Sequence, residues 1–97
     1  MADRTGPRLL IAEDDDATRA LRSAFFEKKG FQVTAVRTGR LALETLSTGA
    51  FDVAGFDVMM PEMTGLEALE QVRARGVNTP VILATALSDA DDVVRGL

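Results

Sequence analysis

The sequence predicts an α/β domain built on a doubly wound, mainly parallel sheet. Short apolar segments of strand length alternate with helical segments along the 97 residues. This alternation is typical of parallel strands joined by right-handed helical crossovers, with helices on both faces of the sheet. Acidic or hydroxyl residues directly follow three of the apolar segments. With the strand order 2-1-3-4, these residues meet at the carboxyl ends of the strands, where sites form in such sheets.

Composition limits the chain to one small domain, residues 1–97, with a flexible tail at residues 1–7. No apolar run is long enough to span a membrane. The net charge of −4 argues against direct binding to nucleic acid. Cysteine and histidine are both absent, which fits a reducing cytoplasm and excludes thiolate zinc sites and histidine-based catalysis.

The first strand and helix are predicted from residues 9–30. Residues 9–12 form a continuous apolar run, typical of a strand buried on both faces. Asp15 and Asp16 are expected to act as helix caps rather than ligands, and Gly30 to end the helix. The apolar face of this amphipathic helix is predicted to contain Ala17, Ala20, Leu21, Ala24 and Phe25.

The middle of the chain predicts an edge strand, a short helix and a third strand. Residues 31–35 alternate apolar and polar side chains, as in a half-exposed edge strand, and residues 41–46 form a short helix. Residues 51–56 are the third strand, which ends at Asp57. Gly55 inside this strand either weakens the assignment or marks a close approach of another backbone.

The last predicted elements follow the same alternation. Thr64 and Glu67 have the spacing of a capping box, so a helix is expected from there to Gly76. Residues 81–84, preceded by a proline, form the fourth strand. A fourth helix is expected at residues 88–97.

Four side chains follow the predicted strands and are candidates for one site: Glu13, Asp14, Asp57 and Thr85. Position alone leaves Asp57 as a metal ligand, a nucleophile or an ordinary turn residue. Carboxylates ~4 Å apart repel each other by roughly 4 kcal/mol per pair at an effective dielectric near 20, unless one is protonated or a divalent cation lies among them. Oxygen ligands without histidine or cysteine select Mg²⁺, Mn²⁺ or Ca²⁺. Acids beside a hydroxyl group favour a phosphate site over a dedicated metal cage.

Three segments, LLIAEDD (residues 9–15), FDVMMPEMTGLEAL (residues 56–69) and PVILATA (residues 80–86), resemble the receiver domain of bacterial two-component response regulators. Their order and spacing match over residues 8–97. The resemblance implies a flavodoxin-like doubly wound parallel sheet with strand order 2-1-3-4, in which the fifth βα unit of the family is incomplete or absent here. A lysine that follows the fifth strand in the family is missing with it.

The resemblance also implies roles for individual residues. Asp57 is the phospho-acceptor, while the Thr85 hydroxyl and the Ala86 amide contact the phosphoryl group. The implied cofactor is Mg²⁺, held by Glu13, Asp14, Asp57 and the backbone carbonyl of Met59.

The implied function is that of a phospho-accepting switch. The phosphoryl group comes from a sensor histidine kinase or a phosphotransfer protein, and the only catalysis expected is Mg²⁺-dependent self-phosphorylation and self-dephosphorylation. Contact with DNA is expected only through an output domain outside these residues, and no membrane contact is expected. The alternative hypothesis is a pseudo-receiver, an interaction module that forms a homodimer or a domain swap without phosphotransfer. An enzyme that passes through an aspartyl phosphate is a weaker hypothesis, because it needs more chain for a substrate cap.

Overall fold

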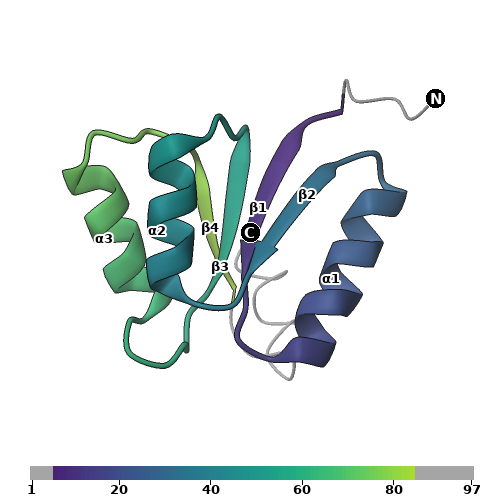
Figure 1. Ribbon diagram of the computed structural model, residues 1–97, viewed down its shortest axis with the longest axis horizontal. Coiled ribbons are helices and arrows are strands. Elements are labelled where there is room, and N and C mark those ends of the chain that lie inside the picture. Colours follow the sequence, from purple (N-terminus) through teal and green to yellow (C-terminus); the bar gives the residue numbers. More distant parts are fainter. Residues whose placement is uncertain (1–5, 85–97) are drawn as a thin grey trace.

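The computed structural model describes residues 6–84, which fold into a four-stranded parallel sheet and three helices (Figure 1). The elements in chain order are β1 (Arg8–Ala12), α1 (Asp16–Lys28), β2 (Gln32–Val36), α2 (Gly39–Thr48), β3 (Val53–Asp57), α3 (Gly65–Ala74) and β4 (Val81–Ala84). The strand order is β2-β1-β3-β4 with every pair parallel, which confirms the predicted fold class and order. The predicted helix at residues 88–97 lies outside the described residues.

The helices cover the sheet from both sides, two on one face and one on the other. α2 and α3 lie side by side on one face, and α1 lies on the opposite face (Figure 1). The buried core is between the sheet and the α2–α3 pair, where Leu10, Ala54 and Phe56 are fully buried. No residue of α1 is fully buried.

The strand register decides which residues meet at the carboxyl edge of the sheet. Ala12 at the end of β1 is the register partner of Phe56 in β3. Glu13 and Asp57 are the next residues in these two strands, so parallel pairing sets them side by side. The Glu13 N–H donates a 3.0 Å hydrogen bond to the Val36 carbonyl of β2, which extends the ladder one residue beyond β1.

Local signals in the sequence set the helix ends. The Asp15 carboxylate caps α1 by accepting a 2.8 Å hydrogen bond from the Thr18 N–H. The predicted capping box of Thr64 and Glu67 at α3 is present in both directions, at 3.1 and 2.9 Å. Positive φ angles of 98° at Gly30 and 79° at Gly76 turn the chain after α1 and α3, as glycine allows.

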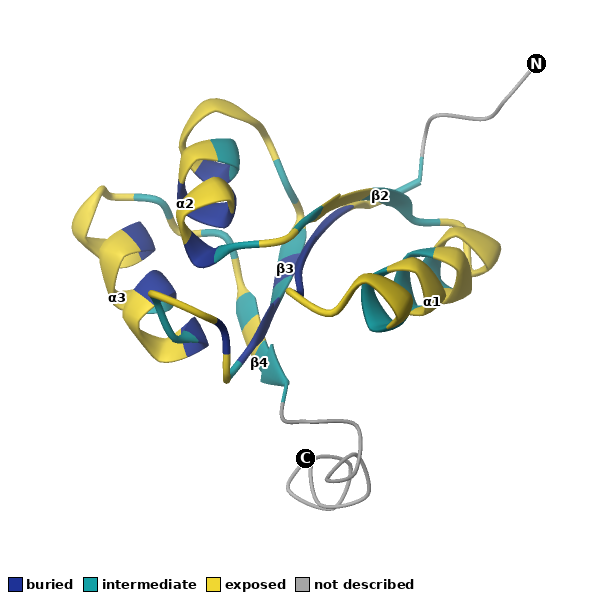
Figure 2. Cartoon of the chain, turned by 60° about the horizontal axis from the view of Figure 1, so that its bottom comes forward, coloured by how far each residue is buried: buried dark blue, intermediate teal, exposed yellow. Residues whose placement is uncertain are grey.

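The apolar face predicted for α1 is not the face that packs on the sheet. Its five residues are all exposed, and Leu21 and Phe25 expose 67% and 54% of their surface. The half-buried face of α1 instead consists of Thr18, Arg19, Arg22, Ser23 and Phe26. Figure 2 shows this helix without any fully buried segment. The helix is turned so that its arginines reach the carboxyl edge of the sheet, where they bind the main chain and side chain of Glu13.

The structure also bears on two smaller predictions, the role of Gly55 and the flexible tail at residues 1–7. A side-chain carbon added at Gly55 would contact nothing within 4 Å, so no close backbone approach requires this glycine. In the predicted tail, the carbonyls of Gly6 and Pro7 accept 2.8 Å hydrogen bonds from Gln32, while residues 1–5 lie outside the described residues. None of the helices in residues 6–84 has the length and apolar character needed to cross a bilayer.

Candidate functional site

Three carboxylates gather at the carboxyl edge of the sheet. Glu13 and Asp14 directly follow β1, and Asp57 is the last residue of the neighbouring strand β3. One oxygen of each carboxylate lies within 4.8 Å of the other two. Of the residues predicted for the site, these three are brought together, whereas Thr85 and Ala86 lie outside the described part of the chain. Met59 is in the loop after β3, and 71% of its surface is exposed.

Glu13 is held on both carboxylate oxygens and exposes only 3% of its surface. Its Oε2 atom accepts a 3.0 Å hydrogen bond from the Asp15 N–H, and its Oε1 atom accepts one of 3.0 Å from Nη1 of Arg22. Burial raises the pKa of the Glu13 carboxyl above its ordinary value, and the negative charge of Asp57 adds to the rise, while the Asp15 and Arg22 contacts oppose it. The carboxylate is therefore well ordered but costly to ionise.

Asp57 is buried and incompletely bonded. It exposes 8% of its surface, and its Oδ1 atom has no hydrogen-bond partner among residues 6–84. A buried acceptor without a partner costs about 1–3 kcal/mol, and more when it is charged. An orphaned carboxylate oxygen beside two other carboxylates matches the ligand set of a hard cation such as Mg²⁺. The observed donor set therefore fits the metal that the sequence predicts.

The main chain around Asp57 is fixed by close packing with the start of α3. The Gly65 N–H donates a 3.0 Å hydrogen bond to the Val58 carbonyl, and the Val58 N–H donates one of 2.8 Å to the Ala84 carbonyl of β4. A side-chain carbon added at Gly65 would lie 2.4 Å from the Asp57 carbonyl oxygen. Gly65 is thus required for the approach of α3 to the phospho-acceptor candidate.

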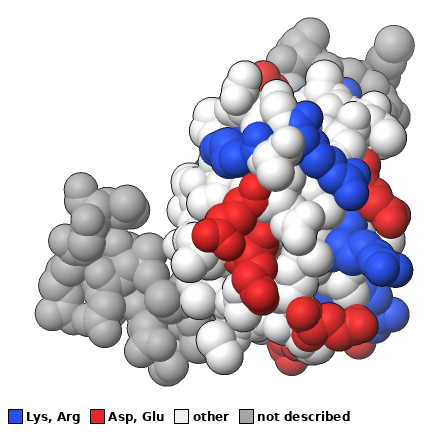
Figure 3. All heavy atoms as spheres, turned by 90° about the vertical axis from the view of Figure 1, so that its left-hand side faces the viewer, with Lys and Arg blue, Asp and Glu red and all other residues white. Residues whose placement is uncertain are grey.

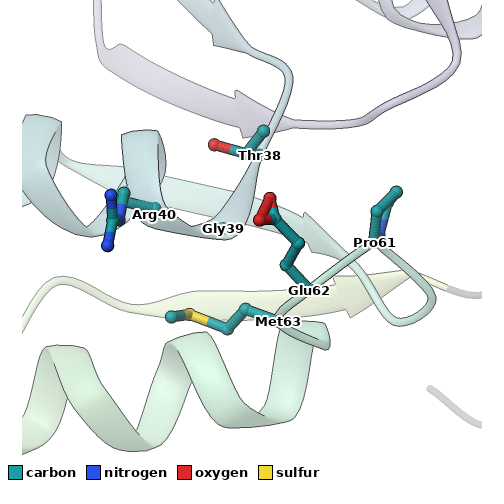
Figure 4. Close-up of a pocket in the computed structure, with 6 residues that line it drawn as sticks. All are labelled: Thr38, Gly39, Arg40, Pro61, Glu62 and Met63. Carbon is teal, nitrogen blue, oxygen red and sulfur yellow. The ribbon is translucent and has the colours of Figure 1, made fainter.

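A groove of about 420 Å³ lies between the loops that precede α2 and α3 (Figure 4). The side chain of Glu62 in this groove points toward Thr38 at the start of α2. Its backbone has a φ of 69°, a left-handed conformation that is unfavourable for residues other than glycine and asparagine. None of the three clustered acids lines the groove, so it is not part of the acidic site.

Two arginines near the acids were missed by the sequence analysis. Arg22 binds the Glu13 carboxylate, and Nη1 of Arg19 donates a 3.0 Å hydrogen bond to the Glu13 carbonyl. They are three residues apart, so both lie on one side of α1. That spacing, soon after an acidic pair, is the signal that could have identified them.

Charge on the outer surface is mixed. Viewed from the side of α3, the described residues present both acidic and basic side chains, in separate groups (Figure 3). Exposed acids on this helix include Glu67 and Glu70, and Arg73 and Arg75 follow at its end. This face therefore lacks the single positive sign that binding to a nucleic-acid backbone requires.

Comparison with known proteins relates the chain to signalling regulators. Residues 9–97 match the family model of the response regulator receiver domain. The chain is 38% identical over 90 residues to the regulatory protein AtoC of Escherichia coli, a match that covers 93% of this chain and 20% of that protein. It is 38% identical over 97 residues to the transcriptional regulatory protein CseB of Streptomyces coelicolor, covering 100% and 40%. The chain thus spans well under half of these relatives.

Solved structures agree with this relation. The receiver domain of the Francisella response regulator 1452 is 33% identical and superposes with a TM-score of 0.80, covering 94% of this chain and 75% of that chain. The receiver domain of the sensor histidine kinase PA1611 from Pseudomonas aeruginosa, described with a magnesium ion coordinated in its active site cleft, is 25% identical with a TM-score of 0.79. That match covers 94% of this chain and 79% of the other.

Proposed function

This chain belongs to the receiver domain family of two-component response regulators, and from that premise we propose that it accepts a phosphoryl group on Asp57. The observation that carries the proposal is the convergence of Asp57 with Glu13 and Asp14 around a buried oxygen without a hydrogen-bond partner. A proton or a nearby positive charge stabilises such a cluster, and it lies at the strand edge where ligands bind in this fold.

The proposed cofactor is Mg²⁺. The groups that would hold it are the carboxylates of Glu13, Asp14 and Asp57 and the backbone carbonyl of Met59. When bound, Mg²⁺ supplies positive charge between the nucleophile and the phosphoryl oxygens. The support for this set is that every donor is an oxygen, which suits a small hard cation.

The proposed reaction is a nucleophilic displacement by Asp57. Its carboxylate oxygen attacks phosphorus in line, and an oxygen–phosphorus bond forms while the bond from phosphorus to the donor imidazole nitrogen breaks. The leaving nitrogen keeps the electron pair. The Thr85 hydroxyl and the Ala86 amide then donate hydrogen bonds to the phosphoryl oxygens, and the movement of Thr85 biases the output state.

The proposed partners follow from the same chemistry. Because the chain contains no histidine, the phosphohistidine belongs to a sensor histidine kinase or a phosphotransfer protein. The curated relatives include transcriptional regulators, so the proposed output is control of transcription by a DNA-binding domain outside these residues, in the cytoplasm.

The proposal is tested by incubating the chain with Mg²⁺ and a small acyl phosphate, followed by intact mass measurement. We expect one phosphoryl adduct, lost in Asp57→Asn and without Mg²⁺. Glu70→Gln is the matched control, since this exposed acid of α3 is not one of the clustered carboxylates and its variant should keep the adduct. A folded chain that binds Mg²⁺ but forms no adduct would overturn the proposal and favour the dimerising pseudo-receiver.

A further inference from the structure

Arg22 forms the least exposed ion pair in the described part of the chain. Its Nη1 atom lies 3.0 Å from Oε1 of Glu13, and the two side chains expose 21% and 4% of their surface. The other two ion pairs among residues 6–84 both use Asp16, whose side chain is 73% exposed. Water screens charge much less at a buried pair than at an exposed one, so the charge of Arg22 acts strongly on its surroundings.

We propose that Arg22 is a built-in counter-ion of the acidic site, which holds Glu13 in the metal-free protein and keeps the affinity for Mg²⁺ low. This inference rests on the proposed function, because it concerns the same metal site. Arg22 touches Glu13 alone among the three acids, so it is a positioning residue that acts through Glu13.

The geometry of Glu13 supports this role. Both carboxylate oxygens are already occupied, Oε1 by Arg22 and Oε2 by the Asp15 N–H. A cation that uses Glu13 must share an oxygen with one of these donors or displace it. The main-chain donor is fixed by the start of α1, whereas the arginine is a flexible side chain that can withdraw.

Charge balance gives the direction of the effect. One guanidinium beside three carboxylates offsets a third of their charge if all three are ionised, and it repels a divalent cation that enters the cluster. Removal of Arg22 strengthens the repulsion among the three carboxylates and increases their attraction for Mg²⁺. Arg22 therefore lowers the affinity for Mg²⁺ and stabilises the metal-free state of the site.

The test measures Mg²⁺ binding to the whole 97-residue chain by isothermal titration calorimetry. We expect Arg22→Met to bind Mg²⁺ tighter by on the order of tenfold, the scale of removing one nearby charge. Arg22→Lys retains the charge and should stay closer to the wild-type affinity. Arg37→Met, which removes an exposed arginine paired with Asp16, is the matched control and should change the affinity less than twofold.

A double variant checks that Arg22 acts through Glu13. In a Glu13→Gln background, Arg22→Met should tighten Mg²⁺ binding clearly less than in the wild-type background, because the ion pair that holds Glu13 is already lost and only the repulsion between the guanidinium and the cation remains. Circular dichroism of each variant establishes that it is folded. Unchanged or weaker binding in folded Arg22→Met would overturn the inference.

The outcomes separate this inference from the proposed function. A chain that binds Mg²⁺ with the expected Arg22 effect but forms no phosphoryl adduct retains the counter-ion role and loses the phosphotransfer proposal. A wild-type chain that binds no Mg²⁺ overturns the counter-ion role, whatever the result with the phosphodonor.

Discussion

The two faces of the sheet are packed by different chemistry. On one face, α2 and α3 cover fully buried apolar side chains such as Leu10 and Phe56. On the other face, α1 has no fully buried residue (Figure 2), and its Arg19 and Arg22 side chains donate hydrogen bonds to Glu13 at the end of β1. The first face is held by burial of apolar surface, whereas the second combines the buried Leu9 and Ile11 of β1 with polar contacts of α1 that end at the acidic cluster.

The two faces should therefore contribute to different properties, one to folding stability and the other to the charge of the acidic site. Burial of apolar area is the largest favourable term in folding, so the α2–α3 face should carry most of the folding free energy among the described residues. The contacts of α1 stabilise less but set the charge and order of Glu13. Substitutions on the two faces should therefore produce different kinds of defect.

The largest expected effect is on the α2–α3 face. Phe56→Ala removes a fully buried ring from the core and should lower the free energy of unfolding by about 3–5 kcal/mol. Phe25→Ala, the matched change on α1, removes a ring that is 54% exposed and should cost less than about 1 kcal/mol. Urea denaturation followed by circular dichroism measures both. Equal losses would contradict the division between the faces.

Two glycines on either side of Asp57 in the sequence, Gly55 in β3 and Gly65 at the start of α3, give the next largest contrast. Gly65→Ala forces a side-chain carbon against the Asp57 carbonyl oxygen and should cost about 1–3 kcal/mol. Gly55→Ala meets nothing within 4 Å on the less covered face and should stabilise the strand by about 0.5–1 kcal/mol. Thermal unfolding of the two variants compares them directly. A Gly65→Ala protein as stable as wild type would show that α3 can move away from Asp57.

Much of the fold was predictable because local signals mark its elements. Asp15, Thr64 and the glycines at the helix ends act within a few residues of their own position, so the sequence alone reveals them. The position of acids after apolar strands likewise predicted that Glu13 and Asp57 share one edge, since parallel pairing leaves little choice.

The orientation of α1 was not predictable in the same way. The apolar spacing of Leu21 and Phe25 correctly indicated a helix, but it did not determine which side of the helix packs on the sheet. That choice depends on where the capped first turn starts and on the reach of Arg22 to Glu13, which is a contact between residues nine apart. Thr85 and Ala86, predicted for the same site, lie outside the described residues and stay predictions.

The polar side of the comparison predicts a specific pH dependence. Burial raises the pKa of Glu13 above its ordinary value of 4.5, so the native state holds this proton more tightly than the unfolded chain does. The contribution of protonated Glu13 to the free energy of unfolding is complete below about pH 4.5, and it is lost as the pH rises through the raised pKa of Glu13. Without Mg²⁺, wild type should therefore lose stability relative to Glu13→Gln over that range, measured by urea denaturation at several pH values. Glu70→Gln, at an exposed position, should instead follow the wild-type curve of stability against pH. If the curves for wild type and Glu13→Gln ran parallel, the burial of Glu13 would not be the cause of the pH dependence.

The smallest expected effect comes from the loop beside the core-forming face. Glu62 holds a φ of 69°, which costs an ordinary side chain about 1 kcal/mol and asparagine less. Glu62→Asn should therefore raise the free energy of unfolding by up to about 1 kcal/mol, whereas Glu62→Gln removes the same charge without relieving the backbone and should give no gain. If both variants gain equally, the charge of Glu62 near the start of α2 is the unfavourable feature instead of its backbone. In that case the charge of one side chain would affect the α2–α3 side of the molecule, as the charge of Arg22 affects the α1 side.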